Sequence, residues 1–339
     1  MKIRLLSSLL ALGAFASVAS AEPITLRFAS AAPDGTAWAR LFRAMGRDVE
    51  SETKGAVTTK FYFGGIAGNE LQMLDRTRRN QLDGVMSGGM VCMKLSPSIR
   101  AFRLLGLFQS REEASYVLGR LRGTIDNEFA AAGFHNIGEA SLGSDMLFTR
   151  MPINSVADLK KARVWYWDLD EPMRAQLTAA GIPAVGTAVE EAGRAYEDKR
   201  IDGFLAIPAA ALAFQWSAQT QYLSELHLGF LPGCLAMSNH AWDQLTVEER
   251  NALTVAAAKF QSRLETIGRE QDQQLLNGLF ARQGLKQTPV SGGFASEFFE
   301  LARGAREALR DKLIPGELID KVTGWLADYR AEYARPRNN

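Results

Sequence analysis

The sequence predicts an α/β fold made of two similar units, and three observations support this class. Between residues 24 and 88, segments in which apolar and polar side chains alternate are separated by segments with helical periodicity. The same pattern recurs after Ile137. From Thr246 to Arg282 the chain has no proline and consists mostly of strong helix formers, which predicts a helix too long for one unit. Such a helix could pack across both units and couple them around a cleft.

The first unit begins with a strand, because apolar and polar residues alternate up to a turn signal at Ala31–Gly35. Apolar residues then recur every three or four positions from Trp38 to Val49, which predicts an amphipathic helix. The expected strands are Ile24–Ser30, Val57–Phe63 and Gly84–Gly88. Strands that alternate with helices in this way build a parallel sheet covered by helices.

The second unit repeats this order. Ser155 is expected to cap a short helix over residues 156–160, and Thr246 with Glu249 forms a capping box at the start of the long helix. The expected strands are Met146–Phe148, Ala162–Trp167, Ile182–Val185 and Ile201–Ile207, and the expected helices are Pro172–Ala180 and Val189–Asp198.

The N-terminal residues 1–21 predict a secretory signal peptide. Lys2 and Arg4 precede an apolar run over residues 5–18, and Ala19-Ser20-Ala21 is the small-residue pattern that a signal peptidase accepts. The mature chain should begin near Glu22. Over all 339 residues, 39 basic and 38 acidic side chains give a formal charge of +1, so no basic field is present to attract nucleic acid.

An exported chain places Cys92 and Cys234 in an oxidising compartment, where a disulfide is possible. The two residues are far apart in sequence and each lies among apolar neighbours. We therefore expect two buried thiols, with a disulfide as the alternative.

Catalytic and metal-binding motifs are absent from the sequence. His135, His227 and His240 lack a zinc-binding spacing, and no Gly-x-Ser-x-Gly motif occurs. Gly64–Gly68 lacks the spacing of a phosphate-binding loop and is expected to be a turn that lets the backbone approach a ligand. We expect no catalytic residue, no metal and no cofactor.

Among the segments of the sequence, Lys161–Asp168 gives the strongest indication of a ligand-binding site. Arg163 lies in a strand-like pattern, and a buried guanidinium needs an anionic partner. That partner could be a ligand carboxylate, which its planar fork fits, or an internal acid such as Asp168, Asp170 or Glu171. Trp165 and Trp167 could belong to the core or stack on a ligand.

Motifs along nearly the whole mature chain resemble those of one receptor family. They are Leu26-Arg27-Phe28-Ala29, Ala32-Pro33, Gly35, Trp38, Phe63–Gly68, Glu70, Met73-Leu74, Leu82-Asp83-Gly84, Leu107-Phe108, Glu112–Ala114, Pro152-Ile153, Asp158–Lys160, Lys161–Val164, Ile201–Gly203, Tyr222–Ser224 and Trp242–Leu245. In this order they resemble the solute-binding proteins of tripartite ATP-independent periplasmic (TRAP) transporters, in the dicarboxylate-receptor (DctP-like) branch.

The resemblance implies an α/β two-lobed periplasmic binding protein fold, with hinge strands and a long helix spanning both lobes. Lobe 1 would comprise residues 22–143 and 230–275, and lobe 2 residues 144–229 and 276–330. It also implies a non-catalytic periplasmic receptor that closes over a small organic acid and delivers it to the small and large membrane subunits of a TRAP permease.

The resemblance further implies that Arg163 clamps the ligand carboxylate, since it matches the arginine of the family's Lys-x-Arg-Val motif. The sequence departs from many members of the family at two places, and both changes replace polar anchors by apolar residues. Gly143–Met146 lacks the second arginine that many relatives carry in this region. Phe204–Ile207 follows Asp202-Gly203, where many relatives have Gln-Glu-Asn. We therefore expect a monocarboxylate with an apolar or aromatic body. Further expected lining residues are Trp38, Ser87, Met90, Asp145, Trp165, Trp167, Phe204, Phe214 and Gln215.

Other functions stay open at this point. Asp145 and Asp168 leave room for a ligand amine. The chain could instead carry a hydrophobic or lipid-like ligand, signal to a sensor, or be a periplasmic enzyme on the same scaffold, because fold alone does not fix activity.

Overall fold

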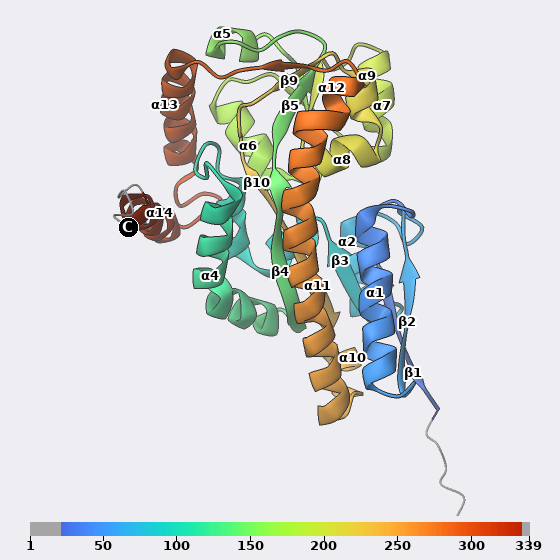
Figure 1. The fold of residues 1–339 in the computed structure, drawn as a ribbon. Coiled ribbons are helices and arrows are strands. Elements are labelled where there is room, and N and C mark those ends of the chain that lie inside the picture. Colours follow the sequence, from blue (N-terminus) through green and yellow to red (C-terminus); the bar gives the residue numbers. More distant parts are fainter. Residues whose placement is uncertain (1–21, 334–339) are drawn as a thin grey trace, which may run out of the picture.

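The computed structural model describes residues 22–333, and these form two β-sheets that lie one above the other in Figure 1. The expected signal peptide lies outside the described residues. The first sheet has the strand order β2-β1-β3-β10-β4, and the second has the order β11-β9-β5-β8-β6-β7. Within residues 22–333, no helix combines the length and the apolar character that crossing a bilayer requires.

The first sheet begins with the predicted parallel strands. β1 (Ile24–Ala29) pairs in parallel with β2 (Val57–Tyr62) and with β3 (Gly84–Ser87). β10 (Phe230–Ser238) then runs antiparallel between β3 and β4 (Phe134–Ser144), so the sheet is mixed. This differs from the purely parallel sheet that the alternation predicted, because β4 and β10 are the strands that lead to and from the second sheet.

Helices cover the first sheet and follow sequence signals. In α1 (Ala37–Glu52) the predicted stripe is buried and Thr36 caps the N-terminus. The other elements on this side are α2 (Glu70–Arg78), α3 (Met90–Leu95), the 3₁₀ helix η1 (Pro97–Arg103), α4 (Arg111–Ala131) and α10 (Asn239–Asp243).

The second sheet contains the second predicted unit. β6 (Val164–Trp167) pairs in parallel with β7 (Ala184–Thr187) and β8 (Gly203–Ala206), while β5 (Met146–Thr149) is antiparallel to β8 and to β9 (Tyr222–Ser224). β11 (Lys286–Thr288) closes one edge beside β9. The helices of this half are α5 (Val156–Leu159), α6 (Glu171–Ala179), α7 (Val189–Glu197), α8 (Pro208–Ala213), α9 (Trp216–Gln219) and α13 (Gly292–Leu309).

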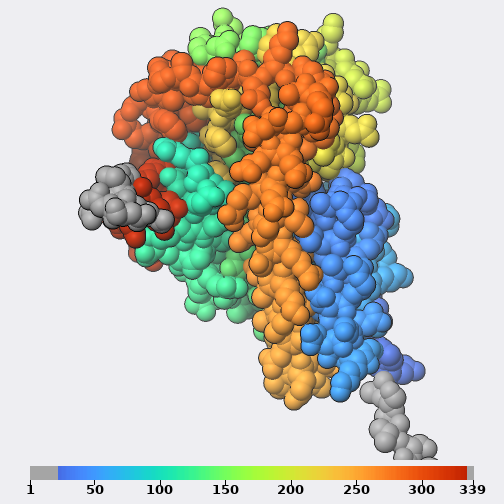
Figure 2. All heavy atoms as spheres, in the orientation of Figure 1, coloured from blue at the N-terminus to red at the C-terminus, as the bar shows by residue number. Residues whose placement is uncertain are grey.

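One long helix joins the two halves, as the sequence predicted. α11 (Val247–Gln274) starts at the capping box of Thr246 and Glu249 and continues through the π-helical turn η2 (Leu275–Leu279) into α12 (Phe280–Arg282). Its first part packs in the core of the first sheet, and Phe280 packs in the core of the second. Figure 2 shows this helix in orange along one face, beside α1 in blue.

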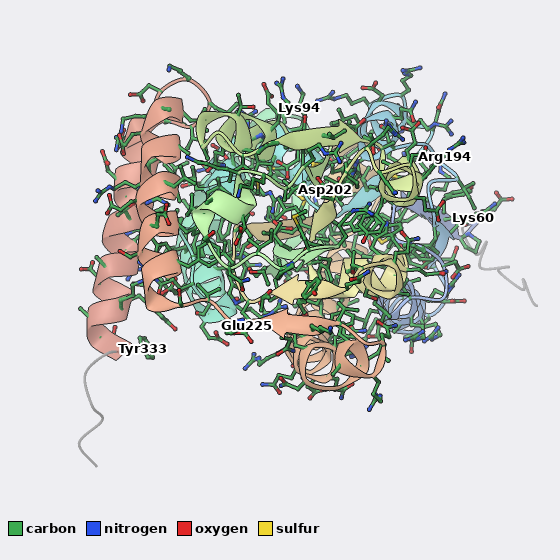
Figure 3. All side chains as sticks on the ribbon, turned by 90° about the horizontal axis from the view of Figure 1, so that it is seen from above. Lys60, Lys94, Arg194, Asp202, Glu225 and Tyr333 are labelled. Atoms are coloured by element: carbon green, nitrogen blue, oxygen red, sulfur yellow. A yellow bond between two sulfur atoms is a disulfide. The ribbon has the colours of Figure 1, made fainter. Side chains whose placement is uncertain are left out.

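The C-terminal helix α14 (Gly316–Tyr333) lies with the first half of the chain. It ends at Tyr333, which is labelled in Figure 3. Its side chains Ile319, Val322 and Leu326 join the hydrophobic cluster that includes α4. This placement differs from the sequence-based boundary, which put residues 276–330 together in the second lobe.

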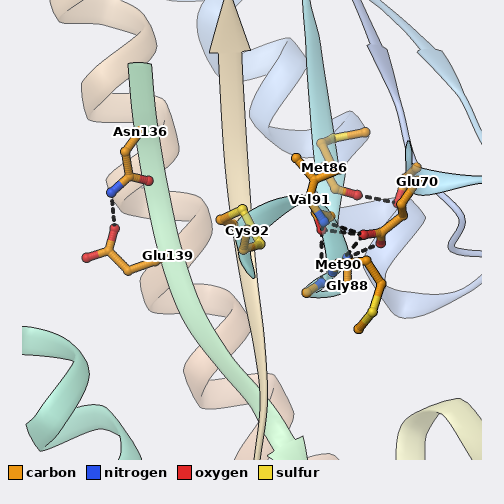
Figure 4. The surroundings of a disulfide bond; sticks show 12 residues. Glu70, Met86, Gly88, Met90, Val91, Cys92, Asn136 and Glu139 are labelled. Carbon is orange, nitrogen blue, oxygen red and sulfur yellow. Dashed lines mark hydrogen bonds between the residues drawn. A yellow bond between two sulfur atoms is a disulfide. The ribbon is translucent and has the colours of Figure 1, made fainter. Parts of the chain in front are cut away.

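Cys92 and Cys234 form a disulfide bond, so the expectation of two free thiols is wrong. β10 runs antiparallel to β3, which places Cys234 opposite Ser87 at the end of β3. The chain turns there into α3 and brings Cys92 over β10, as Figure 4 shows. The two Cα atoms are 5.7 Å apart, a separation that a disulfide spans without moving the backbone. Sequence alone could not reveal this pairing.

Removing the disulfide should destabilise the protein. It links residues 142 positions apart, and opening so long a loop raises the entropy of the unfolded chain. The double variant Cys92→Ala/Cys234→Ala should lower the free energy of unfolding by about 2–5 kcal/mol in urea titrations. The control is wild-type protein measured with and without a reductant. If the free energy of unfolding changes neither in the double variant nor in reduced wild type, the expectation is contradicted.

His227 should make stability depend on pH. It lies between β9 and β10, where burial lowers its pKa although Glu225 opposes the shift. The folded state therefore binds fewer protons than the unfolded state, so this contribution is fully present above the unfolded pKa of 6.5 and is lost as pH falls. Between about pH 7.5 and about pH 5.5, wild type should lose more free energy of unfolding than His227→Gln. If urea titrations show that wild type and His227→Gln lose the same free energy of unfolding, the role of His227 is contradicted.

Candidate functional site

A cavity lies between the two sheets, with an empty volume of about 970 Å³ including its open mouth. Its walls come from the carboxyl ends of β1, β3, β6 and β8 and from the segments that follow them. The carboxyl ends of parallel strands are where ligands bind in open α/β sheets. Residues from both sheets line the cavity, so a ligand there would contact both halves of the chain.

Apolar side chains form most of the wall. The aromatic members are Trp38, Phe42, Trp165, Tyr166, Trp167, Phe214 and Trp216, and the larger aliphatic members are Met86, Met90, Leu142, Val189, Leu205, Ile207, Leu231 and Leu264. Trp216 contacts Trp165 and Phe214 with ring centroids 4.8 and 5.0 Å apart. The indole N–H of Trp165 donates to Thr187 Oγ1 at 3.0 Å, which fixes the ring and leaves its face for packing.

Most of the sequence-predicted lining residues lie on the cavity wall. These are Trp38, Ser87, Met90, Asp145, Trp165, Trp167 and Phe214. Phe204 belongs to the core instead, because it is fully buried and stacks on Trp216. Gln215 precedes α9 in a left-handed conformation and is not a lining residue. Contact of these side chains with a ligand stays a prediction.

Arg163 lies outside the cavity, which corrects its expected placement. It precedes β6 at the amino end of the strand, whereas the cavity is at the carboxyl end. Its side chain is 47% exposed, and Nε and Nη2 each donate to Asp202 at 3.0 Å (Asp202 is labelled in Figure 3). The ion pair with Asp202 raises the pKa of Arg163. Arg163 therefore ties the start of β6 to the start of β8.

The charged end of the cavity is formed by Arg103, Asp145 and Asp170, which we call the buried triad. Arg103 Nε donates to Asp170 Oδ2 at 2.9 Å, and Nη1 donates to Asp145. All three side chains are at most 4% exposed. Burial by itself lowers the pKa of Arg103, but the two carboxylates outweigh it and raise that pKa. Arg103 therefore stays charged, and the triad has a formal surplus of one negative charge when both carboxylates are ionised.

Each member of the buried triad comes from a different element. Arg103 is the last residue of η1, Asp145 is the single residue between β4 and β5, and Asp170 caps α6 by accepting from the Met173 backbone N–H at 3.1 Å. Of these, sequence analysis identified Asp145 alone as a candidate. Arg103 had no recognisable motif, and Asp170 was considered only as a partner for Arg163.

Glu70 is a further buried acid on the cavity wall. Its carboxylate accepts hydrogen bonds from Ser87 Oγ and from the backbone N–H groups of Gly88, Met90 and Val91. Figure 4 shows Glu70 beside Gly88, Met90 and Val91. Burial raises the pKa of Glu70, and these hydrogen bonds oppose the shift. The start of α3 is thus already occupied by the protein's own carboxylate. Within residues 22–333, no cluster of three His, Cys, Asp or Glu side chains could hold a metal ion.

Two sheets joined by crossing strands and a long helix, with a cavity between them, form the periplasmic binding protein fold. The family model for bacterial extracellular solute-binding protein, family 7 (DctP), matches residues 28–307. The chain belongs to this family. Its members are non-catalytic receptors of TRAP transporters, so the resemblance seen in the sequence is confirmed.

Solved structures of TRAP solute-binding proteins share the fold. The sugar acid binding protein DctPAm from Advenella mimigardefordensis, in complex with galactonate, is 19% identical with a TM-score of 0.83, covering 90% of this chain and 98% of its own. A protein from Ochrobactrum anthropi with its C-terminus in the ligand pocket is 20% identical with a TM-score of 0.81, covering 91% and 97%. DctP7 from Bordetella pertussis, which binds pyroglutamic acid, is 17% identical with a TM-score of 0.80, covering 90% and 98%. A search of curated proteins found no match.

Replacing Arg103 should destabilise the fold. The variant Arg103→Met leaves two buried carboxylates without their cation, so the free energy of unfolding should fall by about 3–5 kcal/mol. Arg163→Met is the matched control, and it should lose less because solvent screens its half-exposed ion pair. Urea unfolding followed by circular dichroism measures both, and equal losses would show that Arg103 is not held as described.

Proposed function

We propose that this receptor captures a small organic acid with a single carboxylate and an apolar or aromatic body. The observation that carries this proposal is the cavity wall, which is apolar except for the buried triad, Glu70 and a few small polar groups. Family membership implies delivery of the solute to the small and large membrane subunits of a TRAP permease. The expected signal peptide at residues 1–21 would direct the chain to the periplasm.

The apolar wall favours an apolar solute body. Relatives of this fold bind galactonate, L-gulonate and D-erythronate, whose many hydroxyl groups need hydrogen-bond partners. A buried hydroxyl without a partner costs about 1–3 kcal/mol, and the wall of Trp38, Trp165, Trp167 and Trp216 offers few partners. An aromatic or branched aliphatic body would instead displace water from these rings and gain free energy.

Arg103 is the group that we assign to the solute carboxylate, in place of Arg163. It is the one cationic side chain on the cavity wall among the described residues. A guanidinium has five N–H donors, and Arg103 uses two of them in hydrogen bonds from Nε to Asp170 and from Nη1 to Asp145, while Nη2 lies 2.7 Å from Asp170 Oδ2. The remaining donors can serve one carboxylate. A second solute carboxylate would meet the negative surplus of the triad, which disfavours dicarboxylates.

The proposed capture of the solute also involves closure of two lobes around it. We propose residues 22–143 with 230–275 as one lobe and residues 144–229 with 276–309 as the other. The crossings between the sheets lie at Asp145 and at residues 225–229, where the backbone N–H of Asp145 donates to the Gly229 carbonyl at 2.8 Å. A bend at these crossings would bring the lining residues of the two sheets together around the solute.

The apolar wall also favours a second candidate, a carrier of a hydrophobic or lipid-like ligand. The buried triad and Glu70 argue against it, because a hydrocarbon surface beside buried charges adds desolvation without any compensating contact. Mass spectrometry of an organic extract of the purified protein distinguishes the two, since a carrier would retain a stoichiometric lipid.

Ligand titration tests the proposal. At concentrations near 100 times the dissociation constant, 3-phenylpropionate or 4-methylpentanoate should stabilise the protein by about 2.7 kcal/mol, while succinate and galactonate should have little effect. Thermal unfolding provides the measurement. Arg163→Met should leave the affinity for 3-phenylpropionate within about twofold, because truncating a rim charge outside the cavity removes no solute contact. Stronger stabilisation by succinate or galactonate would overturn the proposal.

A further inference from the structure

The charges on the cavity wall do not balance. Within residues 22–333 the wall carries three acidic side chains, Glu70, Asp145 and Asp170, and one basic side chain, Arg103. All four are buried. Adding a solute that carries only a carboxylate would increase the formal negative surplus beside these buried side chains, and this is unfavourable.

Two of the three acids are satisfied by the protein itself. Glu70 accepts four hydrogen bonds, from Ser87 Oγ and from three backbone N–H groups. Asp170 accepts from the Met173 backbone through Oδ1 and from Arg103 through Oδ2. Neither carboxylate therefore needs a further donor.

Asp145 is the exception. Its Oδ2 accepts from Arg103 Nη1, but Oδ1 receives no hydrogen bond from the described part of the chain. The side chain is only 4% exposed and lies on the cavity wall. Oδ1 is therefore an available acceptor on the cavity wall, and a solute in the cavity can supply a donor to it. Burial raises the pKa of Asp145 and the neighbouring Asp170 adds to the shift, while Arg103 opposes it.

We infer that the solute carries an ammonium group beside its carboxylate, with the ammonium donating to Asp145 and the carboxylate accepting from Arg103. The inference rests on the proposed function and narrows it from an apolar monocarboxylate to a zwitterion with an apolar body, such as an aromatic or branched aliphatic α-amino acid. A zwitterion adds no net charge to the cavity, and its ammonium supplies up to three N–H donors.

The aromatic wall suits such a solute. Indole and phenyl faces attract a nearby ammonium as well as packing against an apolar side chain. Trp165 is held in place on the cavity wall by the hydrogen bond from its N–H to Thr187 and by packing on Trp216. Trp38, Trp167 and Trp216 line the same cavity.

Matched sets of three compounds test the inference by isothermal titration calorimetry on the purified receptor. The first set is L-phenylalanine, 3-phenylpropionate, which lacks the ammonium, and 2-phenylethylamine, which lacks the carboxylate. The corresponding compounds with indole and isobutyl bodies form the second and third sets. In at least one set the amino acid should bind about tenfold or more tightly than both partners, since each charge contact is expected to be made in a desolvated site.

The other outcomes separate the two proposals. If the acids without an ammonium bind as tightly as the amino acids, the inference is wrong and the proposed function stands. If the amines bind most tightly, the carboxylate contact is wrong and both proposals fail. Absence of binding in all three sets also overturns both.

The variant Asp145→Asn assigns the contact. It should reduce the affinity of the amino acid to about that of its deaminated acid, while the affinity for that acid is kept or increased because a negative charge has been removed. Asp168→Asn is the control, since Asp168 is exposed and lies outside the cavity wall. The melting temperature without ligand checks that each variant is folded. Equal losses of amino acid and deaminated acid on Asp145→Asn would contradict the role of Asp145.

Discussion

Burial of Arg103 together with Asp145 and Asp170 is the constraint on which the site depends. None of these side chains can leave water without the others, because an unpaired buried charge is far less stable than the complete group. They come from η1, from the crossing between β4 and β5, and from the start of α6. Holding them together therefore fixes how the chain passes from the first sheet to the second, and it places a charged group where the cavity meets that crossing.

The rest of the cavity contrasts with this charged end. Its walls consist mostly of aromatic and aliphatic side chains, and the N–H of Trp165 already has a partner in Thr187. Recognition must then depend on shape and apolar contact along the walls and on directed hydrogen bonds at one end only. A receptor for polyhydroxylated acids needs the opposite arrangement, with polar groups distributed around the solute. The shared fold accommodates both, because the wall residues can change without altering the sheets that carry them.

Local signals in the sequence were sufficient for much of the fold and for part of the site. The apolar stripe of α1, which begins at Trp38, the capping box of α11 and the strand that carries Trp165 depend on near neighbours, so periodicity and spacing revealed them. Arg103 could not be found in this way, since its partners lie 42 and 67 positions away. The role expected for Arg163 came from its match to the Lys-x-Arg-Val motif, and that match could not show that Arg163 precedes β6 and pairs with Asp202, 39 positions away. The disulfide was missed because it depends on the antiparallel register of β10.

Formation of the disulfide bond between Cys92 and Cys234 depends on the redox conditions of the compartment that surrounds the chain. If the segment expected as a signal peptide directs export, this link between α3 and β10 would form only after the chain has left the reducing cytoplasm. A chain without this link would be easier to carry across the membrane in an extended form. The disulfide would then stabilise the fold only in the compartment where the receptor meets its solute.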